Sequence, residues 1–113
     1  RTAQHAYGGG SLRRFEGFSY DMTKRRLADG EDRTVELTHA EQQLLALLLR
    51  NPGQALGRDQ ILHQVAHRAW DAYDRTADVL VQRLRRKLGD SPRDPRFIRT
   101  AHGEGYIFVA AVE

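Results

Sequence analysis

Residues 74–89 restrict the fold of this chain more than any other segment, because their apolar side chains recur at helical spacing. Steps of four, three and four positions place these side chains on one stripe of an α-helix. The stripe consists of Ala77, Val81, Leu84 and Leu88. We expect Asp74 to cap the N-terminus of this helix and Gly89 to end it. The segment is therefore predicted to be an amphipathic helix with one buried face.

The opposite face of this helix is cationic. It carries Arg75, Val79, Gln82, Arg83 and Arg86, flanked by Asp78, Arg85 and Lys87. On this face and its flanks, five basic residues against one acidic residue give a local charge of +4 (5 − 1). Such a helix fits a DNA major groove. A charged face is more often only solvated surface, and basic residues in a last turn also suit the helix dipole, so this helix alone does not identify a ligand.

Length and composition limit the alternatives. The chain has 113 residues, a net charge of +3 and no cysteine, which excludes a disulfide framework, a thiolate metal site and a cysteine nucleophile. Its longest apolar run, residues 44–49, is too short to span a bilayer. The first residue is Arg rather than Met, which suggests a cytoplasmic fragment of a longer protein. We expect a linker or cloning remnant at residues 1–11 and one domain over residues 12–113.

The chain before the basic helix alternates between strand and helix signals. Residues 12–37 contain β-prone runs with a turn at Asp29-Gly30, which predicts three or four short antiparallel strands. Thr38 and Glu41 form a capping box that opens a buried, leucine-rich helix of about twelve residues, ended by Asn51-Pro52-Gly53. A short strand at Leu56 and a second helix over residues 58–67 follow, the helix having Ile61, Leu62 and Val65 directed inward.

The C-terminal part contains two β-prone runs around a glycine-containing tip, residues 97–100 and 106–109. They predict a hairpin whose exposed edge carries groups suited to phosphate oxygens. These groups are Arg99, Thr100, His102 and Tyr106. A helix, a turn, a cationic helix and a basic hairpin occur in the order of a winged helix-turn-helix.

At this point the sequence resembles the winged-helix effector domain of OmpR/PhoB-type response regulators, from Leu12 to Val112. Six collinear motifs carry the likeness: Leu37-Thr38-x-x-Glu41-x-x-Leu44-Leu45, Asn51-Pro52-Gly53, Arg58-Asp59-Gln60-Ile61-Leu62, Asp74-Arg75-Thr76-x-Asp78-Val79, Arg83-Leu84-Arg85-Arg86-Lys87-Leu88 and Ile98-Arg99-Thr100-x-x-Gly103-x-Gly105-Tyr106. The resemblance implies an α+β fold with an N-terminal four-stranded antiparallel sheet, a three-helix bundle and a C-terminal hairpin wing. It implies sequence-specific binding of double-stranded DNA in transcription control, with no cofactor and no enzymatic activity.

The resemblance also assigns roles by position. Base reading falls to Val79, Gln82, Arg83 and, more weakly, Asp78. Phosphate contacts fall to Arg75, Thr76, Arg85, Arg86, Lys87, Arg99, Thr100, His102 and Tyr106. Contact with RNA polymerase falls to the loop at residues 66–74, with Trp70, Asp71 and Tyr73. A receiver domain would precede residue 1, and weakly binding monomers would pair in tandem on direct-repeat half-sites.

Three positions depart from the family pattern. His102 stands where an arginine is common, and Ile107 stands where a second basic residue is common. Both changes predict a wing with a weaker electrostatic grip. Ala66 replaces a frequent tryptophan, although Trp70 lies nearby in the sequence.

Other chemistries fit the sequence less well. His63 and His67 have the i, i+4 spacing of zinc-protease helices, but Gln64 occupies the position of the general base and no third ligand is evident. Gly103-x-Gly105 suits a turn better than a phosphate cradle. The aromatic residues are expected in the core rather than as stacking platforms for RNA: Phe15, Phe18, Tyr20, Phe97 and Phe108. A winged-helix module that binds an acidic protein partner remains the main alternative.

Overall fold

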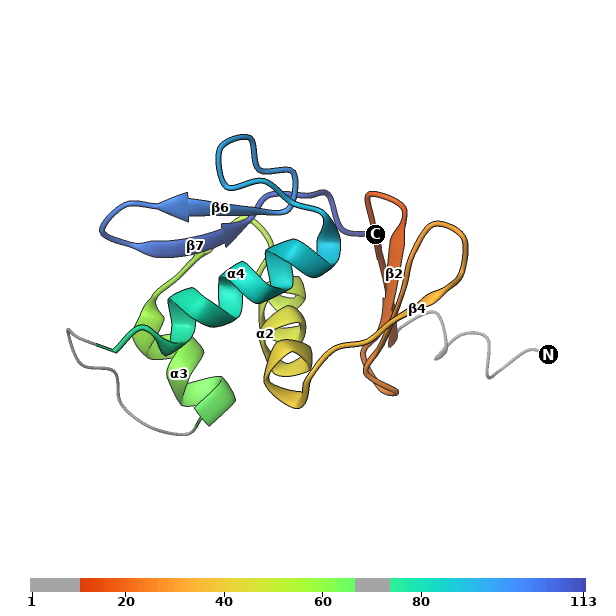
Figure 1. Ribbon diagram of the computed structural model, residues 1–113, viewed down its shortest axis with the longest axis horizontal. Coiled ribbons are helices and arrows are strands. Elements are labelled where there is room, and N and C mark those ends of the chain that lie inside the picture. The colour runs from red at the N-terminus through yellow and green to blue at the C-terminus, as the bar shows by residue number, and fades with distance from the viewer. Residues whose placement is uncertain (1–10, 67–73) are drawn as a thin grey trace. The chain divides into compact units, whose positions relative to one another are not determined.

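The computed structural model describes residues 11–66 and 74–113, which form two compact units. The first unit combines the residues up to Glu36 with residues 111–113 at the end of the chain. The second unit covers residues 37–110. Figure 1 shows the strands of the first unit in orange and the helices of the second in yellow, green and cyan. The predicted linker at residues 1–11 lies, except for Ser11, outside the described residues.

The first unit is an antiparallel four-stranded sheet with strand order β1-β2-β3-β4. Its strands are β1 (Leu12–Phe15), β2 (Phe18–Asp21), β3 (Arg26–Ala28) and β4 (Thr34–Val35), which confirms the predicted strands. A two-residue turn joins β1 to β2, with Glu16 at φ 47° and Gly17 at φ 88°. Two left-handed residues give this turn the twist of the flanking strands. In the β3–β4 turn the Asp29 carboxylate accepts the amides of Glu31 and Arg33, both at 2.9 Å.

The end of the chain covers one edge of this sheet. The amide of Arg14 donates to the carbonyl of Glu113 at 3.1 Å, and the amide of Glu113 donates back at 2.8 Å. This reciprocal pair satisfies backbone groups of β1 that would otherwise be exposed at a sheet edge.

The second unit begins with the predicted capping box. The Thr38 hydroxyl accepts the Glu41 amide at 3.2 Å, and the Glu41 carboxylate accepts the Thr38 amide at 2.8 Å. These bonds start α2 (His39–Arg50), and Asn51 ends it as predicted. Helix α3 (Arg58–Ala66) buries Ile61 and Leu62 but leaves Val65 only half-buried.

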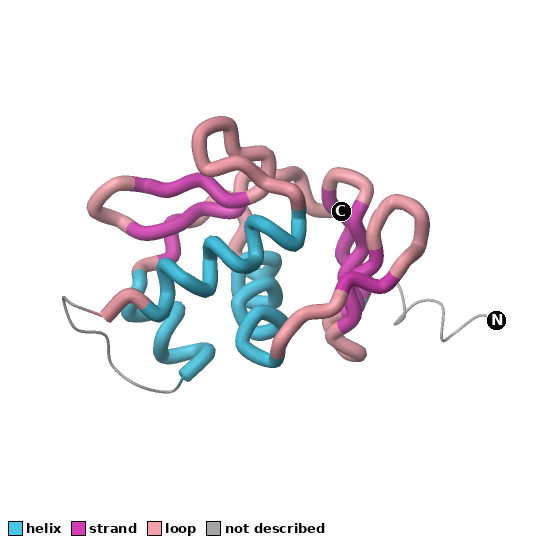
Figure 2. Tube along the Cα trace, in the orientation of Figure 1, coloured by secondary structure: helices cyan, strands magenta, loops and turns pink. Residues whose placement is uncertain are grey.

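Helix α4 (Thr76–Leu88) packs on α2 and α3, as Figure 2 shows. Its predicted apolar stripe is buried, with Ala77, Val81 and Leu84 fully inaccessible and Leu88 4% exposed. Leu80, 5% exposed, joins that stripe. The three helices therefore form the predicted bundle.

A three-stranded antiparallel sheet of order β5-β7-β6 completes this unit. Its strands are β5 (Ala55–Leu56), β6 (Ile98–Ala101) and β7 (Gly105–Phe108). The β6–β7 hairpin is the predicted wing, and β5 is the predicted brief return at Leu56. Gly105 has φ 122°, and a Cβ there would lie 2.0 Å from the Leu56 carbonyl oxygen. Only glycine fits where β7 passes β5.

Four of the five aromatic residues predicted for the core are buried: Phe15, Tyr20, Phe97 and Phe108. Phe18 is half-buried and stacks on Phe15 with ring centroids 5.8 Å apart. Among the described residues, no helix is long and apolar enough to cross a bilayer.

Candidate nucleic-acid interface

The outward face of α4 presents a row of exposed side chains. We call this row the outer stripe; it consists of Arg75, Val79, Gln82, Arg83 and Arg86. Val79 is 45% exposed, an unusual position for a large apolar side chain between cationic neighbours. The row combines a methyl-bearing side chain, an amide and three guanidinium groups along one helix face.

The arginines of the outer stripe have no anionic partner among the residues that the structure describes. Within the described ranges, Arg75, Arg83 and Arg86 make no ion pair and no side-chain hydrogen bond. The same holds for Arg99, which is exposed on β6. Guanidinium groups without a protein acceptor are available to an external anion such as phosphate.

Two hollows border the outer stripe. The first, of about 450 Å³, is lined mainly by apolar residues: Ala40, Val65, Ala66, Arg75, Thr76, Val79, Leu80 and Arg83. The second, of about 430 Å³, is lined by Glu41, Arg83, Arg86 and Lys87. Arg83 lines both, so its side chain lies between an apolar and a cationic surface.

The two ends of α4 were predicted with unequal success. Gly89 ends the helix in the left-handed conformation at φ 72°, as expected, and its amide bonds the Arg85 and Arg86 carbonyls. The N-cap position belongs to Arg75 rather than to Asp74. Asp74 still contributes, because its carboxylate accepts the Thr76 amide at 2.9 Å.

Asp78, expected to face the bases, is directed into the molecule instead, and that prediction is corrected. Its Oδ1 accepts a hydrogen bond from Arg58 Nε at 2.9 Å and another from the Tyr106 hydroxyl. Its Oδ2 is buried and lacks a hydrogen-bond partner. Burial alone would lower the pKa of the Arg58 guanidinium, but bonding and attraction to Asp78 raise it. The carboxylate therefore serves an internal network.

Tyr106, expected at the exposed edge of the hairpin, is 4% exposed, so that expectation is wrong. Burial raises the pKa of its phenol, and the bond that it donates to Asp78 raises that pKa further. The guanidinium carbons of Arg58 and Arg85 lie 5.4 and 5.7 Å from the centre of its ring. Tyr106 lies 28 residues beyond Asp78, so no local sequence pattern predicted this contact.

Arg85 is the clearest correction. It is 2% exposed, although it was predicted as a phosphate contact. Its Nη2 donates to the Ile98 carbonyl at 2.8 Å and to the Thr100 hydroxyl at 3.0 Å. Its Nε also points at the Ile98 carbonyl, at 3.3 Å. The guanidinium thus joins α4 to β6 inside the protein.

Lys87 is also committed internally. Its Nζ lies 2.8 Å from Glu41 Oε1, and the side chains are 33% and 2% exposed respectively. Burial alone would raise the pKa of the Glu41 carboxyl, but Lys87 and the Thr38 amide more than compensate and hold that pKa below its usual range. The predicted phosphate role of Lys87 did not anticipate this bond between α4 and the start of α2.

The hairpin offers fewer contact groups than predicted. Arg99 and His102 are exposed, with His102 in the turn between β6 and β7. Thr100 is half-buried; its oxygen accepts from Arg85, but the hydroxyl can still donate its own proton. Ile107 is half-buried and pairs with Arg99 across the hairpin.

Some predicted site residues lie outside the described residues. Trp70, Asp71 and Tyr73, expected to contact RNA polymerase, are among them, and so is His67 of the histidine pair. The described residues contain no group of three or more His, Cys, Asp or Glu side chains that could hold a metal ion.

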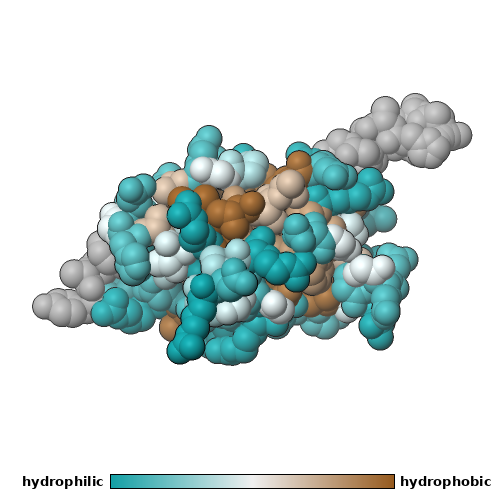
Figure 3. Space-filling view, turned by 90° about the horizontal axis from the view of Figure 1, so that it is seen from above, coloured by the Kyte–Doolittle hydropathy of each residue, from teal (hydrophilic) through white to brown (hydrophobic). Residues whose placement is uncertain are grey.

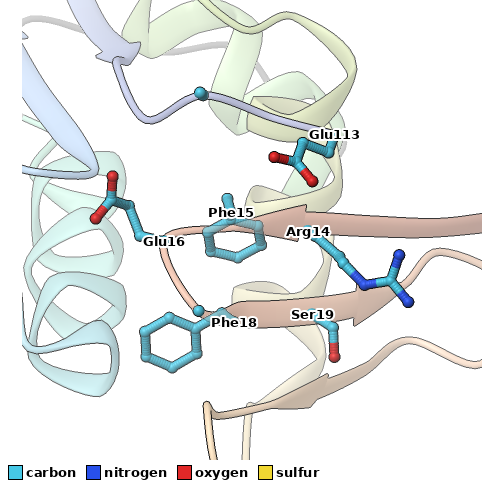
Figure 4. Close-up of a pocket in the computed structure, with 8 residues that line it drawn as sticks. Arg14, Phe15, Glu16, Phe18, Ser19 and Glu113 are labelled. Carbon is cyan, nitrogen blue, oxygen red and sulfur yellow. The ribbon is translucent and has the colours of Figure 1, made fainter.

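Figure 4 shows a separate hollow of about 380 Å³ in the first unit, beside the β1–β2 turn. The rings of Phe15 and Phe18 line it, and the Arg14 guanidinium points away from them. Figure 3 shows the molecule from above relative to Figure 1. Its surface on this side is mostly hydrophilic, with separate hydrophobic areas.

Sequence reasoning missed the internal polar partners: Arg58, Glu41 and Asp90. The Asp90 carboxylate accepts the amides of Arg96, Phe97 and Ile98 at 2.7, 3.3 and 2.9 Å, which fixes the loop between α4 and β6. Aspartate directly after a helix-ending glycine hinted at such a turn, but the distant partners of Arg58 and Glu41 depend on the tertiary fold.

Three packed helices, a cationic second helix of the helix-turn-helix and a β-hairpin define a winged-helix domain. Residues 31–108 match the family described as "Transcriptional regulatory protein, C terminal". The chain belongs to this family, as the winged-helix effector domain of an OmpR/PhoB-type response regulator.

Individual relatives agree with this assignment. The transcriptional regulatory protein AruR of Pseudomonas aeruginosa is 50% identical over 101 residues, covering 89% of this chain and 41% of AruR. The chain spans about two-fifths of the length of the curated relatives it matches. The DNA-binding domain of Klebsiella pneumoniae RstA, solved in complex with the RstA box, is 32% identical with a TM-score of 0.80, covering 87% of this chain and 96% of that domain. The DNA-binding domain of Escherichia coli CpxR is 27% identical with a TM-score of 0.78, covering 88% and 97%.

Proposed function

We propose that this chain binds double-stranded DNA sequence-specifically, as the effector domain of a two-component response regulator that controls transcription. The observation that carries this proposal is the outer stripe: exposed arginines with no ion pair or side-chain hydrogen bond in the described part of the chain, beside an exposed valine and glutamine. An exposed methyl group, an amide and a guanidinium suit a thymine methyl, an adenine edge and a guanine edge in a major groove. The RstA domain, with the same fold, was solved on its DNA box.

The structure supports a smaller contact set than the sequence predicted. We assign base reading to Val79, Gln82 and Arg83. Backbone contacts fall to Arg75, Thr76, Arg86, Arg99, Thr100 and His102. Asp78, Arg85, Lys87 and Tyr106 are left out because each is bonded inside the protein.

The proposal extends to partners that the sequence suggested. One recognition helix reads about half a turn of DNA, so a single domain should bind weakly. Two copies would sit in tandem on direct repeats, a receiver domain would precede residue 1, and the loop with Trp70, Asp71 and Tyr73 would contact RNA polymerase. Footprinting at saturation should then protect two half-sites about one helical turn apart; one short protected half-site would contradict the tandem arrangement.

A titration of duplex DNA at several salt concentrations tests the central claim. Four exposed arginines, Arg75, Arg83, Arg86 and Arg99, should give a slope of log K against log salt of roughly −3 to −4. Arg86→Ala should reduce the magnitude of this slope by about one. Arg50→Ala, which removes an exposed arginine at the far end of α2, is the matched control and should leave the slope unchanged.

A slope near zero would contradict DNA binding. It would favour the alternative of a winged-helix module that packs its cationic helix on an acidic protein.

A further inference from the structure

A polar network links three elements of the second unit beneath the outer stripe. Arg58 at the start of α3 and Tyr106 on β7 both donate to the same oxygen, Oδ1 of Asp78 on α4. The Arg58 guanidinium also lies over the Tyr106 ring, 5.4 Å from its centre. One carboxylate therefore holds together the helix-turn-helix and the hairpin.

A second tie joins the hairpin to the same helix. Arg85 donates to the Ile98 carbonyl and to the Thr100 hydroxyl, both on β6. Positions 78 and 85 are seven residues apart, or about 10 Å along the helix axis. Two ties at separate points fix the angle between hairpin and helix as well as their distance.

This network is a costly way to hold two elements together. Asp78 Oδ2 is buried without a partner, and Arg85 is a charged group removed from water. Well-packed apolar residues often give equal or greater stability than such buried charges. Directional bonds between these groups do select one geometry, which apolar contacts do less strictly.

The geometry matters because DNA presents phosphates and base edges at fixed positions. The outer stripe lies on α4, whereas Arg99 and His102 lie on the hairpin. Both sets can engage one duplex together only if the hairpin keeps a defined angle to the helix. At an incorrect angle, α4 and the hairpin could not contact the same duplex together. Each would then bind separately and more weakly than the two together.

We propose that Arg58, Asp78 and Tyr106, supported by Arg85, are positioning residues for DNA recognition: they contact no DNA and set the angle between wing and recognition helix. This inference rests on the proposed function. It explains why a carboxylate occupies a helix that is otherwise cationic.

The sign of one substitution separates this role from simple electrostatics. Asp78→Asn removes a negative charge near the DNA-binding face, so electrostatics alone would tighten binding. The positioning role requires the opposite, a loss on the order of tenfold for the preferred duplex. Asp59→Asn removes the same charge from the exposed first turn of α3, changes none of Arg58, Asp78, Arg85 and Tyr106, and should bind equally well or slightly more tightly.

A double-mutant cycle tests the route of the effect. Tyr106→Phe removes one hydroxyl and keeps the ring, so it should fold even if a bulkier change does not. If Tyr106 acts through Asp78, combining it with Asp78→Asn should cost no more than the larger single loss. If Tyr106 bonds a phosphate directly, the combined loss should equal the product of the two single losses, which would overturn the proposal.

The 113-residue chain serves for these measurements, with affinities expressed per folded protein from unfolding curves of each variant. A merely structural role would lower stability and leave the affinity of the folded fraction unchanged, and this outcome would overturn the inference.

Arg58→Gln adds a further check: its salt slope should match the parent, and a slope reduced by about one would make Arg58 a phosphate contact. If the parent shows no salt-dependent duplex binding, the proposed function fails. If the parent binds as expected but Asp78→Asn binds as tightly as Asp59→Asn, the inference alone fails.

Discussion

Arg83 and Arg85 lie two positions apart on the same helix and have opposite environments. Arg83 is exposed and has no protein acceptor among the described residues, whereas Arg85 is buried and bonded to β6. Two residues correspond to about 200° of helix rotation, so the two side chains leave α4 on nearly opposite sides. A local charge of +4 therefore overstates the charge that this helix offers to DNA.

The same division runs along the whole helix. The outer stripe presents its arginines to solvent, while Asp78, Arg85 and Lys87 form an inner polar flank in which each side chain is bonded to another element. The inner flank stabilises the protein and the outer stripe is available for binding. The predictions below test this division.

The largest effect is expected at Arg85. Arg85→Met should lower the free energy of unfolding by about 3 kcal/mol, because the Ile98 carbonyl and the Thr100 hydroxyl lose their donor in a buried site. Arg86→Met, one position along on the outer stripe, should change it by less than about 0.5 kcal/mol. Urea unfolding followed by circular dichroism measures both. Equal, small effects would show that the inner flank contributes little to stability.

The next effect concerns DNA. Arg83→Ala should weaken binding to the preferred duplex by about 1–3 kcal/mol and to random duplex much less, because a base-edge contact is lost. Arg86→Ala should weaken both duplexes about equally, because a phosphate contact carries no sequence information. Uniform losses in both variants would remove Arg83 from the base-reading set.

Much of the fold was predictable because local signals agreed with one another. The capping box at Thr38 and the glycine at position 89 each act within one turn of the chain, and the apolar stripe of α4 repeats within one helix. All three predictions were confirmed. The N-cap of α4 was misplaced by one residue because Asp74 bonds the Thr76 amide from just outside the helix.

The candidate site was less predictable because charge and helical position do not reveal distant partners. Helix rotation places Arg83 and Arg85 on opposite sides of α4, but the Arg85 acceptor on β6, thirteen residues further along the chain, could not be predicted from the helix. The alternation of side chains along β7 likewise does not show which face of the strand carries Tyr106. Its partner Asp78 lies twenty-eight residues earlier in the chain. The outer-stripe assignments to DNA contacts remain predictions.

A smaller effect is expected at Glu41, where Lys87 joins the inner flank. The pKa of Glu41 is lowered in the folded state, so its stabilising contribution is present above the pKa of the unfolded chain and is lost as pH falls through the folded pKa. Glu41→Gln should lower stability by about 1.5 kcal/mol at pH 7 and flatten the acid loss of stability below about pH 4.3.

Unfolding curves at several pH values check this expectation, with Lys87→Met as the partner variant. Asp29, whose pKa is also lowered by the Arg33 and Glu31 amides, keeps part of the acid dependence in both variants. An unchanged acid profile in Glu41→Gln would show that the Glu41–Lys87 pair adds nothing to folding. Lys87→Met should weaken DNA binding less than Arg86→Ala does, since Lys87 already has a protein acceptor.

The smallest effect is expected at the wing, where the exposed His102 stands in the turn between β6 and β7. An arginine at this position would carry a fixed charge on a planar group that suits a phosphate. His102→Arg should therefore bind duplex DNA more tightly than the parent, by less than about 1 kcal/mol for one exposed contact. The salt slope of the variant should also increase in magnitude, by up to about one. If His102→Arg binds no more tightly than the parent and keeps its salt slope, then the turn makes no contact with the duplex and the DNA contacts of the wing reduce to Arg99 and Thr100.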